Sequence, residues 1–525
     1  MTGQGINDPR VAVGRTGGTQ ARRRMRDARS RAFDMIAGSD VVAPYRVLTQ
    51  TDVKRVHRAA LEVLARVGIA APTARVRTVA LRAGCTLDPS GRLLFPSSLV
   101  EDTLTQAART FTVHGRDARF DFEARNGRIN FCTGGAAVMM LDMAQRRYRP
   151  STLRDLYDLA RLCDTLDNIQ WFTRPVVATD IADPFELDAN TVYACAAGTQ
   201  KHIATSFSQG DHVHRLLPML DALAGGDGGF ARRPFCTVHA TTIVSPLSFA
   251  PDSLDVACAA VDIGMPIHCQ TGPQAGATAP AALAGTLVQA CAEGLASLTV
   301  INILRPGHPV VLGNWPFVSD LRTGAFSGGG GEQALLGAAV CQMAAFYGVP
   351  GGCGAGMTDS KLPDSQSGFE KALTLALAGL SGGGFVYESA GMLASLLGCS
   401  FEAMVIDNDM LSSIRRIGRG IEVTDETLSV EVIAETVAGP GHYLGARQTH
   451  DLMESEYVYP RHADRSSPDD WLAAGATDIW DRAAARARDV LDGHFPVLVE
   501  PRSDRAIRDA YSIHLPTHWL KESRP

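Results

Sequence analysis

The sequence predicts a (β/α)₈ fold, in which eight parallel strands alternate with helices and close into a barrel. Two observations support this prediction. Between about residue 129 and residue 421, short runs of β-forming residues alternate with long segments of helical apolar periodicity, and the strand-like runs number eight. Eight strands that are each followed by a helix match the count that a closed barrel requires. An open doubly wound sheet is the alternative, although such sheets rarely need eight evenly spaced units.

The expected strands are residues 129–133, 169–177, 202–207, 235–241, 266–270, 309–313, 351–355 and 385–388. The segments that separate them have helical periodicity, at residues 153–166, 187–197, 212–224, 253–263, 287–304, 332–347 and 366–380. A further helix at residues 401–417 follows the last strand.

The rest of the chain divides into three regions around the barrel, which we place at residues 129–421. Residues 1–45 carry eight arginines among glycine and threonine, which is typical of a solvated tail without fixed structure. The alternative is that this basic tail binds a nucleic acid or a membrane surface. Residues 46–128 predict a small α+β domain with strand-like segments at residues 110–114 and 119–122. Residues 422–525 predict a helical C-terminal extension with a helix start at Thr424.

Composition excludes several classes of protein. The net charge of −6 and the pI near 6.2 argue against a nucleic-acid-binding surface over the whole protein. No stretch approaches about 18 consecutive apolar residues, so we expect no membrane span. The 11 cysteines are scattered without a CxxC pair, which fits neither a disulfide framework nor a zinc site. We therefore expect a cytoplasmic protein.

In this architecture the active site lies where the strands end and the helices begin. The expected strand ends are rich in glycine and hydroxyl residues, which let a substrate or a large cofactor approach the backbone closely. Gly272, Gly276 and Thr358 are the candidates for contact with a cofactor. Gln270, at the end of its strand, is a polar candidate for contact with the substrate.

Aromatic residues form only 6% of the chain, yet several fall near the expected rim: Trp171, Phe172, Phe207, Trp315, Phe317 and Tyr387. A cluster of ring faces recognises a quaternary ammonium group, which has no N–H to donate. We take Trp171, Phe207, Trp315 and Tyr387 as candidate substrate-binding residues. Ordinary core packing is the alternative for each ring, and above all for Trp171, which lies inside its strand.

The ionisable candidates on the rim are Asp359, Lys361, Asp364 and Glu388. No paired-carboxylate motif follows from their spacing, and we name Asp359, Ser360 and Glu388 as the candidate catalytic residues. No metal site is expected, because there is no HExxH motif and the strand histidines His239 and His268 each stand alone.

The glycine-rich run at residues 327–331 follows a strand and precedes a helix, a geometry that can hold a phosphate. It lacks the P-loop lysine and the GxGxxG spacing. We therefore interpret it as a flexible loop.

Several segments resemble the trimethylamine methyltransferase family in the same order along the chain. They are residues 60–64 with Gly68, 272–280 with Ala292-Glu293, 320–324, 356–361 continuing through 364–366, and 439–445. The resemblance extends from about residue 46 to about residue 495. It implies a TIM-type barrel that transfers a methyl group from a methylated amine to a Co(I) corrinoid. That corrinoid is carried by a partner protein and not held tightly by this chain.

The trimethylamine-specific branch of that family contains pyrrolysine, whereas this chain contains only the twenty standard residues. It therefore resembles the other branch, which is associated with quaternary amines such as glycine betaine. Demethylation of a quaternary ammonium expels a neutral amine that needs no proton, so the protein mainly binds, orients and excludes water. Arg174 and Arg322 are candidates for holding a betaine carboxylate, because guanidinium binds carboxylate bidentately. We also expect a homo-oligomer.

Two other functions remain open from the sequence. The first is a TIM-barrel lyase or hydrolase for a small anionic substrate, which would use Asp359, Lys361 and Glu388. The second is a binding protein that holds a quaternary amine or a corrinoid without turnover.

Overall fold

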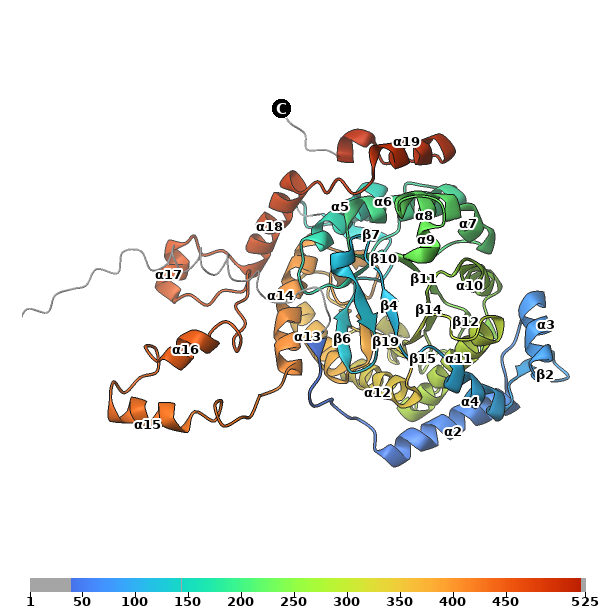
Figure 1. Ribbon diagram of the computed structural model, residues 1–525, viewed down its shortest axis with the longest axis horizontal. Coiled ribbons are helices and arrows are strands. Elements are labelled where there is room, and N and C mark those ends of the chain that lie inside the picture. The colour runs from blue at the N-terminus through green and yellow to red at the C-terminus, as the bar shows by residue number, and fades with distance from the viewer. Residues whose placement is uncertain (1–38, 143, 521–525) are drawn as a thin grey trace, which may run out of the picture. The chain divides into compact units, whose positions relative to one another are not determined.

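A barrel of eight parallel strands forms the centre of the protein, as seen in a computed structural model that describes residues 39–142 and 144–520 (Figure 1). Its strands are β6 (Arg128–Phe131), β9 (Trp171–Thr173), β10 (His202–Thr205), β11 (Cys236–Ala240), β14 (Ile267–Thr271), β16 (Val310–Asn314), β19 (Gly351–Gly354) and β20 (Gly384–Tyr387). From β9 onward each strand pairs with the next in this order, and β20 pairs with β6. A parallel bridge between Cys132 and Trp171 joins β6 to β9 and closes the ring. The predicted (β/α)₈ barrel and all eight of its strands are confirmed.

The helices surround the strands (Figure 1) and leave the strand residues almost entirely buried, which explains the continuous apolar runs. They are α5 (Leu153–Asp164), α6 (Pro184–Gly198), α7 (Gly210–Arg215), α8 (Leu217–Leu223), α9 (Gly229–Arg232), α10 (Pro251–Ile263), α11 (Leu283–Leu304), α12 (Gly331–Tyr347), α13 (Ser365–Leu380) and α14 (Phe401–Gly418). The single helix expected at residues 212–224 is wrong. It divides into α7 and α8, because Pro218 has no amide N–H with which to continue α7.

Helix α11 is long and apolar enough to cross a membrane, with a mean hydropathy of 1.6 over its most apolar window. In the structure 83% of that window is buried, and α11 packs against α2 (Gln50–Arg66) and α4 (Ser97–Gln106). Its apolar character therefore reflects a position between two layers of protein.

The segment before the barrel contains α2, α3 (Ala74–Arg82), β2 (Thr86–Leu87), β3 (Leu93–Leu94), α4, β4 (Phe111–Val113) and β5 (Phe122–Ala124). Residues 119–122 were expected to form a strand, but Ala118–Phe120 is a 3₁₀ turn and the strand begins at Phe122. The reason is local, because the side chain of Asp117 accepts a hydrogen bond from the backbone of Arg119 and caps the turn. One further strand, β1 (Ser39–Asp40), pairs antiparallel with β6.

By their contacts, the described residues form two compact units. Residues 39–422 and 460–520 belong to one unit, which includes α17 (Pro468–Ala473), α18 (Ile479–Gly493) and α19 (Pro501–Ala510). Residues 423–459 belong to the other, which contains α15 (Val430–Ala438) and α16 (Arg447–Leu452). The helix start expected at Thr424 is wrong: Thr424 and Thr427 bond each other in a turn, and the helix begins at Val430. The tail predicted at residues 1–45 lies mostly outside the described residues.

Short hairpins follow the carboxyl ends of the barrel strands. After β6, β7 (Met139–Leu141) and β8 (Tyr148–Pro150) form a sheet with β21 (Met392–Leu393) and β22 (Gly398–Cys399), which follow β20. After β11 comes the pair β12 (Ile243–Val244) and β13 (Ser248–Phe249). After β14, β15 (Gln274–Ala275) pairs with β17 (Phe317–Asp320), which turns back into β18 (Ala325–Ser327). These hairpins frame the mouth of the barrel.

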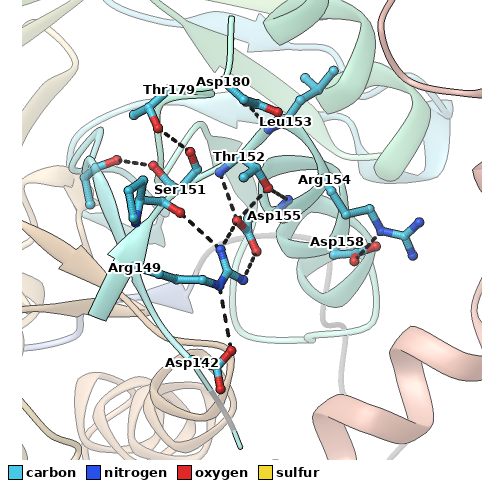
Figure 2. A network of polar contacts seen from close by, with 12 residues as sticks. Asp142, Arg149, Ser151, Thr152, Leu153, Arg154, Asp155, Asp158, Thr179 and Asp180 are labelled. Atoms are coloured by element: carbon cyan, nitrogen blue, oxygen red, sulfur yellow. Dashed lines mark hydrogen bonds and ion pairs between the residues drawn. The ribbon is translucent and has the colours of Figure 1, made fainter. Parts of the chain in front are cut away.

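One of these hairpins is fixed to the start of α5 by charged groups. Figure 2 shows Arg149 of β8 reaching between Asp142 and Asp155. Both terminal nitrogens of Arg149 donate to Asp155 at 2.7 Å, and its Nε lies 3.7 Å from Asp142. Asp155 also forms the capping box of α5 with Thr152. Charge-assisted hydrogen bonds therefore hold this side of the mouth against the barrel.

Candidate active site

Three of the rings expected at the rim gather inside the barrel. The ring centroid of Tyr387, at the end of β20, lies 5.8 Å from that of Trp171 in β9 and 5.3 Å from that of Trp315. All three side chains are buried. Trp315 and Tyr387 meet because the barrel brings the carboxyl ends of β16 and β20 to the same level, whereas Trp171 is the first residue of β9.

Two histidines complete this ring cluster. His239 and His268 are register partners on β11 and β14, with their Nδ1 atoms 3.3 Å apart. The ring of His268 stacks on Tyr387 at 4.1 Å and 14°. Burial lowers the pKa of His239 to about 3 and that of His268 well below its usual value, so both rings are neutral at pH 7. The sequence indicated two isolated core histidines, and their pairing across strands was missed.

Glycines on neighbouring strands make room for the ring cluster. A Cβ added to Gly313 in β16 would lie 2.0 Å from Nε2 of His268. A Cβ added to Gly352 in β19 would lie 2.9 Å from a ring carbon of Tyr387. Because these distances are below normal contact, no larger residue fits at either position without displacing a ring.

Glu388 lies directly after Tyr387 and is the least satisfied ionisable group near the ring cluster. It is 2% exposed and has a left-handed φ of 63°, a conformation that costs energy for a residue with a side chain. Its Oε2 atom has no hydrogen-bond partner among the described residues. Burial raises the pKa of Glu388 to about 8. The side chain is therefore mostly a neutral acid at pH 7.

The carboxyl of Glu388 and the indole of Trp315 flank a common position. A Cβ added to Gly354 would lie 2.8 Å from Oε2 of Glu388 and 3.4 Å from the Trp315 ring. On the other side, a Cβ added to Gly134 would lie 3.3 Å from Cγ of Glu388. The acid is thus held between two glycines, with its oxygen next to an aromatic face.

Many polar atoms around the ring cluster lack a partner within the described part of the chain. They include Nε1 of Trp171 and of Trp315, Nε2 of His239 and of His268, the hydroxyls of Thr173, Thr271 and Tyr387, Oδ1 of Asn314 and Oε1 of Gln333. Buried polar atoms are nearly always hydrogen-bonded in folded proteins. Their concentration in one place marks where a ligand or water completes the bonding.

A guanidinium group lies beside the ring cluster. Arg174 follows β9 and is partly buried, and its side chain forms no hydrogen bond or ion pair with any described residue. Burial is the largest influence that lowers the pKa of His239, and the positive charge of Arg174 is the second. The guanidinium is therefore close to that ring. The charge of Asp188 acts on Arg174 and raises its pKa, but the carboxylate of Asp188 accepts its hydrogen bond from His212, at 2.7 Å. Arg174 therefore retains its donors for a ligand.

Three other candidates make no ring contact with this cluster. Arg322 is 88% exposed in the turn between β17 and β18, where it pairs with Asp320 at 2.8 Å. Phe207 is buried after β10 without an aromatic contact to the cluster rings. Gln270 is partly exposed at the end of β14, and its side chain bonds to no described residue.

The loop after β19 uses its polar side chains to hold other segments. Asp359 accepts hydrogen bonds from the hydroxyls of Ser327 and Ser395 and from the amide of Gly328. Ser360 donates to Asp364, the N-cap of α13, and Thr358 donates to Glu370. Lys361 donates to the main-chain carbonyl of Asp359. These residues are joined to one another, whereas Glu388 shares no hydrogen bond or ion pair with Asp359 or Lys361.

The two candidate glycines lie in the turn after β14. Gly272 abuts the ring of Phe317, at 3.2 Å from a virtual Cβ. Gly276 is exposed, with a φ of 83°, and abuts the side chain of Leu321. Between residues 39 and 520, apart from residue 143, no group of three or more histidine, cysteine, aspartate or glutamate side chains is arranged to hold a metal ion.

Comparisons with known proteins point to one family. The family model described as trimethylamine methyltransferase (MTTB) matches residues 15–513. A trimethylamine methyltransferase of Methanosarcina thermophila is 31% identical over 452 residues, which cover 85% of this chain and 93% of that protein. A glycine betaine methyltransferase of Desulfitobacterium hafniense is 28% identical over 469 residues, which cover 88% of this chain and 96% of that protein. The solved structure of the monomethylamine methyltransferase of Methanosarcina barkeri aligns over 86% of this chain and 96% of its own, at 13% identity and a TM-score of 0.41.

Proposed function

Because this chain belongs to the trimethylamine methyltransferase family, we propose that it takes a methyl group from a methylated amine similar to glycine betaine. The acceptor that we propose is a Co(I) corrinoid carried by a separate protein. The observation that supports this substrate most is the buried ring cluster, which has both a carboxyl and a guanidinium next to it.

The two ends of a betaine match the two sides of the site. A quaternary nitrogen cannot donate a hydrogen bond, so it is held by ring faces, each contact contributing roughly 0.5 to 2 kcal/mol. Trp315 and Tyr387 offer such faces. The carboxylate of the substrate pairs with Arg174, whose fork of donors is unused by the protein. Arg322 is too exposed and already paired, so this proposal does not use it.

The chain's own residues bind and orient the substrate and exclude water. The expelled amine leaves as a neutral molecule, so the reaction needs no general acid. His239 and His268 are neutral and therefore do not repel the cation. The corrinoid supplies the nucleophile when its carrier protein binds.

The corrinoid is proposed to approach the turn after β14, where Gly272 is partly exposed and Gly276 is exposed. Thr358 fits less well, because it is buried and bonded to Glu370.

The test is demethylation in solution. Purified protein is incubated with glycine betaine and Co(I) cobalamin as the acceptor, and dimethylglycine is measured by mass spectrometry. Longer betaines, carnitine-like compounds and trimethylamine form the rest of the panel. We expect product from at least one betaine and less from a Trp315→Ala variant. The absence of demethylated product across the whole panel would contradict the proposed activity.

The alternatives give different results. A lyase or hydrolase would depend on Asp359 and Lys361, which the structure engages in loop contacts, so we do not favour it. A binding protein without turnover would bind a betaine tightly in calorimetry and yield no product. We also propose a cytoplasmic location, supported by eleven cysteines that are all free and buried, and a homo-oligomeric state, which light scattering would measure.

A further inference from the structure

We propose that Glu388 is the counter-charge for the methylated nitrogen and that binding of a permanent cation releases the proton of Glu388 to solvent. This inference rests on the proposed function, because it assigns the cation-binding side of the same site. It goes further in making substrate binding a coupled exchange of a cation for a proton.

The geometry places the carboxyl where a cation would rest. Oε2 of Glu388 is buried and without a hydrogen-bond partner among the described residues. Oε2 of Glu388 and the Trp315 ring both pack against Gly354, so the two groups lie next to each other. A cation that binds beside them would contact an aromatic face and a carboxylate together, and both contacts are favourable for a charge that lacks any N–H.

The protein itself offers Glu388 no cation. The ionisable groups on the barrel strands and just beyond their carboxyl ends are Arg128 (β6), Cys132 (beyond β6), Arg174 (after β9), His202 (β10), Cys236 and His239 (β11), His268 and Cys269 (β14), Cys353 (β19) and Tyr387 (β20). The pKa values of the three histidines are lowered and those of the four thiols and the tyrosine are raised, so these groups carry no charge at pH 7. Arg128 lies at the start of β6 and pairs with Asp40. Arg174 forms no ion pair with the acid.

Burial alone therefore sets the resting state of Glu388. Its pKa of about 8 means that the carboxyl holds its proton at pH 7. A bound cation favours the carboxylate and lowers that pKa. The exchange is balanced: the protonated acid and the free cation give the carboxylate–cation pair and one proton in solvent. The same acid discriminates against a neutral ligand, which cannot lower its pKa.

The experiment is isothermal titration calorimetry of tetramethylammonium and glycine betaine between pH 6 and pH 9.5. Titrations in two buffers with different ionisation enthalpies count the protons released. We expect about one proton released near pH 7 and almost none at pH 9.5, since the free protein has then already lost it. Affinity should rise about tenfold per pH unit up to pH 8 and then level off.

Matched variants separate this mechanism from general effects of pH. Glu388→Gln should bind with an affinity that is independent of pH and close to that of the wild type at pH 6, with no proton released. Glu402→Gln is the control, because Glu402 is also buried, has a raised pKa and carries an unpartnered oxygen, but lies on α14 away from the rings. Its binding should match the wild type at every pH.

A carbon isostere tests the charge of the ligand directly. The ligand 3,3-dimethylbutanoate has the shape of glycine betaine with carbon in place of nitrogen, and it should bind without proton release.

Binding of tetramethylammonium without proton release near pH 7 would overturn the role of Glu388, because that measurement needs no variant. Proton release on binding, with no demethylation in the betaine panel, would instead contradict the proposed activity and leave the exchange intact. Failure of both cations to bind would overturn both.

Discussion

A single methyl group at Gly354 is the sharpest test of where the substrate binds. In Gly354→Ala the new Cβ would lie 2.8 Å from Oε2 of Glu388, about 0.6 Å short of the 3.4 Å at which ordinary contact begins, and 3.4 Å from the Trp315 ring. The carboxyl is the movable end of its side chain, so the fold adjusts by turning it away from the indole. Strain of about 1 to 3 kcal/mol is typical of one added methyl group in a packed site. If that strain falls on the bound state, the affinity for glycine betaine falls by about 5- to 150-fold.

Calorimetry at pH 8 measures this loss, and thermal unfolding shows whether the fold is intact. Gly337→Ala in α12 is the matched control, because its Cβ would meet only the sulfur of Cys353 in β19 at 3.9 Å and the Cβ of Ala378 in α13 at 4.0 Å. Helix propensity favours that change by up to about 1 kcal/mol. If Gly354→Ala bound glycine betaine within twofold of the wild type and melted at the same temperature, the substrate site would lie elsewhere.

Four further predictions follow from the same contacts. Trp315→Leu should weaken glycine betaine binding by about 2- to 30-fold in calorimetry, the loss of one cation–π contact, and an unchanged affinity would exclude the ring from the site. Arg174→Gln should weaken glycine betaine binding by about 10- to 150-fold but leave tetramethylammonium unaffected; equal losses for both ligands would contradict a carboxylate-binding role. Lys371→Met should lower the free energy of urea unfolding by about 3 to 5 kcal/mol, because it leaves the buried carboxylate of Asp407 without the ammonium group that lies 2.7 Å away. A loss under about 1 kcal/mol would refute this. The wild type should lose stability relative to Glu388→Gln as pH rises from about 4.5 through 8, because the raised pKa of Glu388 means that the unfolded state loses the proton first; a stability difference between the two proteins that stays constant over this range in melting curves would contradict this.

The fold could be predicted because its signals are local and repeated. Each barrel strand is a short buried run that is followed by a longer apolar or amphipathic segment. The count of eight is therefore correct even where the predicted ends of elements are not. The errors have local causes. Pro218 divides one expected helix, and the side chain of Asp117 caps a turn where a strand was expected.

The site could be predicted only in part. Trp315 and Tyr387 could be placed together because they lie at the carboxyl ends of strands, which a barrel brings to one level, whereas Trp171 begins its strand. The partnership of His239 with His268 depends on the register between two strands, which no local pattern specifies.

The roles of the polar loop residues could not be predicted from the sequence either. Asp359 and Glu388 are both acidic residues just beyond a strand, yet one is held by three hydrogen bonds and the other lacks a partner for Oε2. That difference arises from segments distant in sequence, such as the loops that carry Ser327 and Ser395.

The bare backbone of β19 limits how this barrel can change its substrate. Three of the four residues of this strand are glycine, and the inward positions Gly352 and Gly354 have no atoms left to remove. Any substitution there makes the interior smaller, so this wall can only narrow the choice of ligand. Space for a larger amine must come from side chains on the facing strands, where Trp171 and His239 can still be shortened. We therefore expect larger substrates to be accommodated by substitutions on β9 and β11, while the glycines of β19 stay unchanged.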